Sequence, residues 1–281
     1  MSGAGALASK LAGTRLALIG AGNMGFAMLQ GWAVGGLTGE SVVVIEPNPS
    51  EQLRALCLAH GFPLLATPAA SAPRAAVVLA IKPQMLDAGA TAAAPFVGPE
   101  TLVVSILAGK RVADISARLP ASPAIVRAMP NTPAAVGRGI TGAFASPATG
   151  ATRRDRADAL LAAIGQVEWL DDEAQIDALT AVSGSGPAYV FYLVEALAAA
   201  GVEAGLPAAL AERLARATVE GAGELLYRQP ETAAATLRER VTSPGGTTAA
   251  ALAVLMAGDG LSPLMTRAVA AAKRRAGELS G

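Results

Sequence analysis

The chain has 281 residues, of which 52% are hydrophobic and only 4% aromatic, so it can bury a sizeable core of small aliphatic side chains. Lysine plus arginine and aspartate plus glutamate number 22 each, so no net field attracts nucleic acid or an anionic membrane. The single cysteine, Cys57, excludes an internal disulfide, and the single histidine, His60, excludes a histidine-based metal cluster, so we expect no metal site. Residues 1–13 show no leader pattern, and we predict a soluble, cytoplasmic protein.

The first part of the chain alternates short β-branched runs with helical patterns. Strands that alternate with helices are typical of an α/β fold, in which a doubly wound parallel sheet is covered on both faces. We predict strands at 15–19, 41–46, 76–81, 101–106, 124–128, 140–145 and 167–170, and helices from the turn after residue 20 to 34, at 51–60 and at 152–164.

After about residue 173 the strand pattern disappears and only helical patterns follow. We therefore predict a Rossmann dinucleotide-binding domain at 1–173 and an all-α dimerisation and substrate-binding domain at 174–281. The expected helices of the second domain are 176–181, 187–200, 207–227, 231–240, 248–256 and 262–279.

The helical half has too few aromatic residues to cover its own apolar surface. Large uncovered apolar surfaces normally indicate an interface, so we predict a homodimer through the C-terminal helices, with a larger ring of dimers also possible. The most apolar predicted helix, 187–200, is interrupted by Glu195 and is too short to cross a bilayer, so we predict no membrane contact.

Residues 20–25 match the pattern G-x-G-x-x-G directly after the first predicted strand and open a helix. In that context the first glycine makes a tight turn, the second lets the backbone approach a pyrophosphate, and the third lets helix and strand pack closely. The predicted cofactor contacts in this turn are Gly20, Ala21, Gly22, Asn23, Met24 and Gly25.

Glu46 ends the second predicted strand, about 20 residues after the glycine turn, where an acid commonly holds the ribose hydroxyls of NAD. Asn48 and Ser50, close behind it, have side chains suited to a phosphate. The same short segment thus offers an acid for the ribose hydroxyls of NADH and polar side chains for the additional phosphate of NADPH. These residues are therefore compatible with either cofactor.

Further cofactor contacts are predicted where later strands end, because ligands of open α/β sheets bind at the carboxyl edge. Lys82 ends one strand beside Ala80, and Pro83 keeps it extended. Ala108 and Gly109 form a turn of small residues that a nicotinamide can approach.

Asn131 follows the strand at 124–128 and is held between Pro130 and Pro133. Its amide is suited to a substrate or nicotinamide contact. A structural Asx turn is an equally open interpretation.

Residues 241–248 read Val-Thr-Ser-Pro-Gly-Gly-Thr-Thr before an alanine-rich helix. Ser243 can cap that helix, Pro244 fixes its own φ, and Gly245 and Gly246 allow backbone angles that a Cβ forbids. The result is a group of free N–H donors that attracts anions at the positive end of a helix dipole. Taken alone, the segment favours a structural helix cap, since most capped helices bind nothing.

Together these segments resemble the pyrroline-5-carboxylate reductase family over almost the whole chain, from residue 18 to about 279. The segments that carry the resemblance are residues 19–25, 81–84 (Ile-Lys-Pro-Gln), 127–134, 180–189 (Thr-Ala-Val-Ser-Gly-Ser-Gly-Pro-Ala-Tyr) and, most diagnostic, 241–248.

The resemblance implies a Rossmann domain, an intertwined helical dimerisation domain, and reduction of the cyclic imine 1-pyrroline-5-carboxylate to L-proline by hydride transfer, usually from NADPH. The segment 183–189 would line the dimer core. The substrate carboxylate would be bound, and the imine oriented for catalysis, by the loop residues Ser243, Gly245, Gly246, Thr247 and Thr248.

One departure from the family pattern concerns the cofactor. Residues 46–50 are Glu-Pro-Asn-Pro-Ser, without the phosphate-binding arginine that many members carry after the second strand. We therefore expect NADPH to work but NADH to compete unusually well.

Two alternatives compete with this interpretation. A β-hydroxyacid dehydrogenase has a similar start but needs a lysine on a helix of its second domain, and Lys273 is the only lysine after Lys110. A protein that binds NAD(P) without turnover requires none of the residues at 243–248, so the presence of this segment argues against that alternative.

Overall fold

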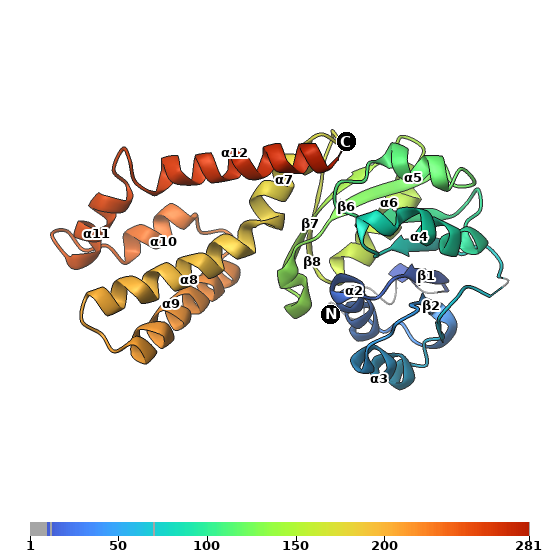
Figure 1. Ribbon diagram of the computed structural model, residues 1–281, viewed down its shortest axis with the longest axis horizontal. Helices are drawn as coiled ribbons and strands as arrows, with labels where there is room; N and C mark the ends of the chain where they lie inside the picture. Colours follow the sequence, from blue (N-terminus) through green and yellow to red (C-terminus); the bar gives the residue numbers. More distant parts are fainter. Residues whose placement is uncertain (1–9, 12, 70, 281) are drawn as a thin grey trace. The chain divides into compact units, whose positions relative to one another are not determined.

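The computed structural model describes residues 10–11, 13–69 and 71–280 (Figure 1). Most of residues 1–13, in which no leader pattern is predicted, therefore lie outside the described residues. The chain forms two compact units, one of residues up to Gly184 together with the C-terminal segment from Lys273, the other of Ser185–Ala272.

The first unit is built on an eight-stranded sheet with the order β3-β2-β1-β4-β5-β6-β7-β8. The chain moves outward from β1 to β3 and then returns to the other side of β1 with β4, so the strand order reverses at β1. The strands are β1 Leu16–Ile19, β2 Val42–Ile45, β3 Leu64–Leu65, β4 Ala76–Leu79, β5 Leu102–Ser105, β6 Ala124–Met129, β7 Gly139–Ala145 and β8 Gly165–Trp169.

The predicted α/β fold class is confirmed, but the sheet is not parallel throughout. β7 pairs antiparallel with β6, and β8 then pairs parallel with β7. The reason is the short connection between β6 and β7, which consists of a 3-10 turn, η4 Thr132–Val136, and its flanks. A parallel crossover needs about a dozen residues or more, usually in a helix.

Helices cover both faces of the sheet. α2 Asn23–Val34, α3 Glu51–His60 and α6 Gly150–Ala162 pack on one face, and α4 Leu86–Ala93 and α5 Val112–Arg118 pack on the other. Successive residues of a strand point to opposite sides, so a strand that is apolar at every position makes both faces of the sheet apolar.

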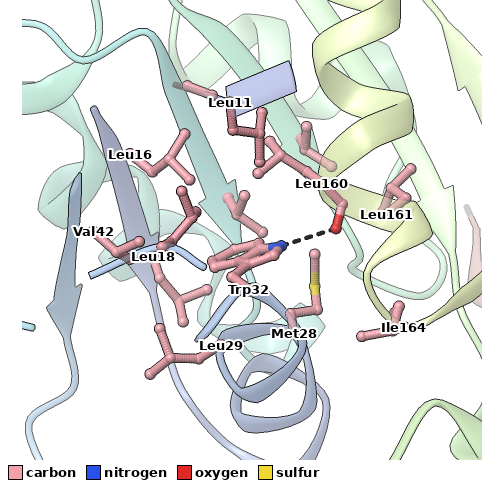
Figure 2. Packing of buried hydrophobic residues seen from close by; sticks show 14 of the residues in the cluster. Leu11, Leu16, Leu18, Met28, Leu29, Trp32, Val42, Leu160, Leu161 and Ile164 are labelled. Carbon is pink, nitrogen blue, oxygen red and sulfur yellow. Dashed lines mark hydrogen bonds between the residues drawn. The ribbon is translucent and has the colours of Figure 1, made fainter. Parts of the chain in front are cut away.

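Trp32 lies at the centre of the first of these cores (Figure 2). Its side chain is fully buried among residues of β1, α2 and α6, and its indole Nε1 donates a hydrogen bond of 2.8 Å to the carbonyl oxygen of Leu160. This bond joins α2 to α6 across 128 residues of sequence and satisfies the one polar atom of the indole.

The first unit continues beyond the predicted boundary at 173 and includes α7 Gln175–Leu179 and a π turn, Thr180–Gly184. Buried Arg127 on β6 forms ion pairs with Glu173 at 3.1 Å and Asp177 at 3.8 Å, which hold this segment to the sheet. The C-terminal segment returns to the same place, because Ser280 Oγ donates to Asp177 Oδ1. The assignment of functions to 1–173 and 174–281 stays a prediction.

The second unit is helical, with α8 and α9 packed against each other. It contains α8 Gly186–Glu203, α9 Ala208–Arg228, α10 Ala234–Arg240 and α11 Thr247–Leu255, and α12 Leu261–Leu279 begins in it and ends in the first unit. Among these five helices only α9 has buried residues, Ala211 and Ala215.

The apolar helix predicted at 187–200 is longer than expected. With α7 and the π turn it forms a helical stretch, Gln175–Glu203, of 29 residues, which is long and apolar enough to cross a membrane by length and composition alone. The prediction that this helix is too short was therefore wrong, because the π turn joins α7 to α8 in one helical stretch.

Candidate functional site

The glycine turn connects β1 to α2 at the point where the strand order reverses. Gly20 has a φ of +84°, and a Cβ on it would lie 2.6 Å from Cγ2 of Ile81. A Cβ on Gly25 would lie 2.6 Å from the carbonyl oxygen of Gly20. Only glycine fits either position, and the close approach that results brings the start of α2 to the carboxyl edge of the sheet.

Gly22 differs from its two partners because a Cβ there would meet no atom within 4 Å. It is the N-cap of α2, and no side chain caps the helix. Gly22 lines a cleft of about 710 Å³, whose walls include residues that follow β1, β2, β3 and β4. Open space beside uncapped N–H donors fits a pyrophosphate, so the residues present suit a dinucleotide.

The predicted cofactor contacts fall into two groups. The residues that line the cleft are Gly20, Ala21, Gly22, Asn23, Glu46, Asn48, Ala80 and Lys82. The residues that do not are Met24, Gly25, Pro83, Ala108 and Gly109, and their contacts with a cofactor stay predictions.

The carboxylate of Glu46 is fixed by two backbone donors. Oε2 accepts from the amide of Ala21 at 2.9 Å, and Oε1 accepts from the amide of Asn48 at 3.0 Å. A carboxylate held at this place can accept from ribose hydroxyls and repels an additional phosphate. Ser50 Oγ accepts from the amide of Leu53 and caps α3, so this hydroxyl also has a structural role.

Gly109 has a structural reason to be glycine that the sequence did not reveal. Its φ is +72°, and a Cβ would lie 2.7 Å from the carbonyl oxygen of Leu279. The end of α12 thus packs on the turn after β5, where a nicotinamide contact was predicted.

Asn131 is 8% exposed, and its amide already has protein partners at both ends. Oδ1 accepts from the amide of Ile140 at 2.9 Å, and Nδ2 donates to the carbonyl oxygen of Ser183 at 3.1 Å. These bonds link the loop after β6 to β7 and to the π turn, so the amide joins distant segments and does not form a local Asx turn. Its predicted contact with substrate stays a prediction.

The segment 241–248 lies in the second unit, where its backbone departs from the prediction in one respect. The amide of Gly246 donates to the carbonyl oxygen of Ser243 at 3.0 Å, and Gly245 has a φ of +70°. A type II turn requires a positive φ at its third residue, and proline is common at its second. The N-cap of α11 is Gly246, without a side-chain cap, so the prediction that Ser243 caps this helix was wrong.

Three hydroxyl groups of this loop are available to bind a ligand. Among the described residues, no hydrogen bond to protein is formed by the hydroxyls of Ser243, Thr247 or Thr248, whereas neighbouring Thr242 Oγ1 donates to the carbonyl oxygen of Arg238 at 2.6 Å. Because the first N–H groups of α11 lack a cap as well, the loop presents several donors and no acid of its own. Such a loop can bind a small carboxylate.

A relative from Pseudomonas aeruginosa named pyrroline-5-carboxylate reductase is 41% identical over 267 residues, which are 95% of this chain and 97% of the relative. This chain belongs to the pyrroline-5-carboxylate reductase family. The family model for pyrroline-5-carboxylate reductase dimerisation matches residues 173–279, and the model for NADP oxidoreductase, coenzyme F420-dependent, matches residues 15–109.

Solved structures of family members have the same fold. A pyrroline-5-carboxylate reductase from Coxiella burnetii, 35% identical, matches with a TM-score of 0.87 over 95% of this chain and 99% of its own. The enzyme from Plasmodium falciparum, solved with NADP bound, is 25% identical and matches with a TM-score of 0.77 over 96% of this chain and 99% of its own. These matches extend over both units of the chain.

The different surroundings of Gly22 and Gly25 predict different effects of an added methyl group. Gly22→Ala should weaken NADPH binding by about tenfold or more, because the methyl group enters the space for the pyrophosphate, while the thermal unfolding midpoint stays unchanged. Gly25→Ala should lower the unfolding midpoint, because its Cβ meets the Gly20 carbonyl. Fluorescence titration and thermal unfolding measure the two effects; equal loss of stability in both variants would contradict this assignment.

Proposed function

We propose that this member of the family reduces 1-pyrroline-5-carboxylate to L-proline with NADPH or NADH, the last step of proline biosynthesis. The observation that carries the proposal is the loop 243–248, a type II turn that precedes an uncapped helix with three uncommitted hydroxyls. We further propose that the protein acts in the cytoplasm, where its one cysteine, free and buried, stays reduced. Cell fractionation that found it elsewhere would contradict this.

The carboxylate must be a main source of the substrate's binding energy. The substrate has about eight non-hydrogen atoms, and even the best small ligands gain at most about 1.5 kcal/mol per atom. Hydrogen bonds to a charged group contribute about 1.5–3 kcal/mol each. The amides of Thr247 and Thr248, which begin α11, and the Ser243 hydroxyl can supply several such bonds without an arginine.

Orientation then accounts for much of the catalysis. When bound, the reduced nicotinamide supplies a hydride for the imine carbon. The loop holds the substrate by its carboxylate, and we assign to Thr248 Oγ1 a hydrogen bond with the ring nitrogen. The proton that this nitrogen receives comes from Thr248 or from water.

The proposed reaction is tested by the loss of nicotinamide absorbance when purified protein is mixed with pyrroline-5-carboxylate and either NADPH or NADH. We expect substrate-dependent oxidation of both cofactors, with kcat/KM for NADPH less than a hundredfold above that for NADH, because the fixed carboxylate of Glu46 favours ribose hydroxyls.

The assay has two separate negative outcomes. Oxidation no faster than in the absence of substrate would contradict the reductase activity and leave a protein that binds nicotinamide without turnover. Activity with a preference for NADPH above a hundredfold would contradict only the role given to Glu46.

Thr248→Ala should reduce kcat/KM for pyrroline-5-carboxylate by about ten- to a hundredfold. The substitution removes one hydrogen bond to the ring nitrogen, which is charged or gains charge during the reaction. Cofactor affinity should not change. Thr242→Ala is the matched control, because the Thr242 hydroxyl is already bonded to Arg238 within its own helical turn. Near-normal turnover of Thr248→Ala would remove Thr248 from the mechanism.

We also propose that the chain forms a homodimer through the helices of its second unit, which has almost no core of its own. Large apolar side chains there are solvent-exposed, among them Phe191 at 63% and Tyr192 at 69% on α8 and Val254 at 71% on α11. Exposing such a surface costs free energy in water, and pairing with a second copy buries it. Rings of such dimers would extend the same arrangement.

Sedimentation should therefore give a mass of twice 27.9 kDa or a multiple of that dimer. Phe191→Glu should shift the equilibrium towards monomer, because it places a charge in the buried interface. Leu58→Glu, on the surface of the first unit at a residue 85% exposed, should leave the mass unchanged. A monomeric wild type, or protein recovered only with membranes, would contradict the dimer.

A further inference from the structure

A cavity that the reductase reaction does not use lies at the amino edge of the sheet. It has a volume of about 760 Å³ and is formed by the segments that precede β4 and β5 and by the first turns of α6. The cofactor cleft follows the carboxyl ends of β1, β2 and β4, so the two sites lie at opposite edges of the same sheet.

Three arginines from two distant segments line this cavity. Arg74 precedes β4, whereas Arg153 and Arg156 lie one turn apart on α6 and therefore share a face of the helix. All three are partly buried. A buried cation keeps its charge at a cost in free energy unless a partner compensates it.

The partners within the chain use only part of what these guanidinium groups offer. Among the described residues, Arg74 donates one hydrogen bond, from Nη1 to the carbonyl oxygen of Glu40, and Arg156 donates one, from Nη1 to the carbonyl oxygen of Ala75. The remaining N–H groups of each fork are left for solvent or a ligand.

Arg153 is the most fully paired of the three, but its carboxylate partner is exposed to solvent. It bonds the carbonyl oxygens of Pro99 and Glu100 and forms an ion pair with Glu100 Oε2 at 2.5 Å. The Glu100 side chain is 93% exposed and is the only acid among the described residues that line the cavity. Water screens such a pair, so Glu100 can turn aside at little cost.

The surroundings of Arg74 add to the positive charge. Burial and the nearby Arg15 lower the pKa of Arg74, and Glu40 opposes them. Three arginines thus line the cavity with a single glutamate among the residues that the structure describes, in a chain whose total charge is zero. The first N–H groups of α6, which no side chain caps, line the same space.

We propose that this cavity binds a small multivalent oxyanion of the phosphoryl class, held by Arg74, Arg153 and Arg156. Planar guanidinium forks match phosphate oxygens in pairs, and three of them suit a group with several charged oxygens better than a single carboxylate. The site is independent of the proposed reductase activity.

The test is calorimetric titration of inorganic pyrophosphate at constant ionic strength into protein whose cofactor cleft is saturated with NADP, so that the glycine turn does not compete. Wild type should show saturable binding. Arg153→Gln and Arg156→Gln should each raise the Kd by about tenfold. Arg118→Gln removes an arginine paired with exposed Asp87 on α4, away from this cavity, and should leave the Kd unchanged.

Glu100→Gln gives a second, independent arm, because a change at so exposed a side chain leaves the fold intact. It removes the acid that competes for Arg153 and should lower the Kd by about threefold or more. Absence of saturable binding to wild type, an equal effect of Arg118→Gln, or malonate binding as tightly as pyrophosphate would each overturn the proposal.

Discussion

The approach of one backbone to another at the turn after β1 is the constraint on which the nucleotide-binding unit depends. Gly20 lies against Ile81, and Gly25 lies against the carbonyl of Gly20, with no room for a side chain at either place. Because α2 can therefore begin directly after β1, its uncapped N-terminus meets the cleft between the segments that follow β2 and β4, which lie on opposite sides of β1. Glu46 then fastens the turn by accepting the amide of Ala21.

A second constraint is the burial of Arg127 in the middle of β6. A buried guanidinium is stable only with charged or hydrogen-bonded partners, and both of its carboxylate partners, Glu173 and Asp177, come from the segment that follows the last strand. Glu173 also accepts the amide of Val112, and Asp177 accepts the Ser280 hydroxyl. One buried charge thus joins the sheet, α5, α7 and the C-terminal end of the chain.

The two anion sites that we propose for catalysis are built from backbone and not from cationic side chains. The turn at 20–25 and the turn at 243–246 each place glycines before a helix whose first N–H groups have no side-chain cap. Backbone donors are fixed by the helix, so they lose less conformational entropy on binding than a long arginine or lysine does. The arrangement suits small ligands, for which orientation decides the rate.

The sequence by itself determined what depends on neighbouring residues. The alternation of apolar runs predicted all strands except β3, together with α2, α3 and α6, but it did not predict α4 or α5. The G-x-G-x-x-G pattern predicted the turn after β1, and the two glycines at 245–246 indicated backbone angles that a Cβ forbids, as the positive φ of Gly245 confirms. These features follow from local sterics and from side-chain periodicity, which a short window of sequence contains.

Only the tertiary structure decided what depends on residues far apart in the chain. The reversal of β7, the partners of Asn131, the contact of Gly109 with Leu279 and the network around Arg127 join segments separated by 9 to 170 residues. The local sequence favoured Ser243 as the N-cap of α11, but the turn places Gly246 at the N-cap position. Such pairings are selected by packing and by the need to satisfy buried polar groups, and a sequence pattern records neither.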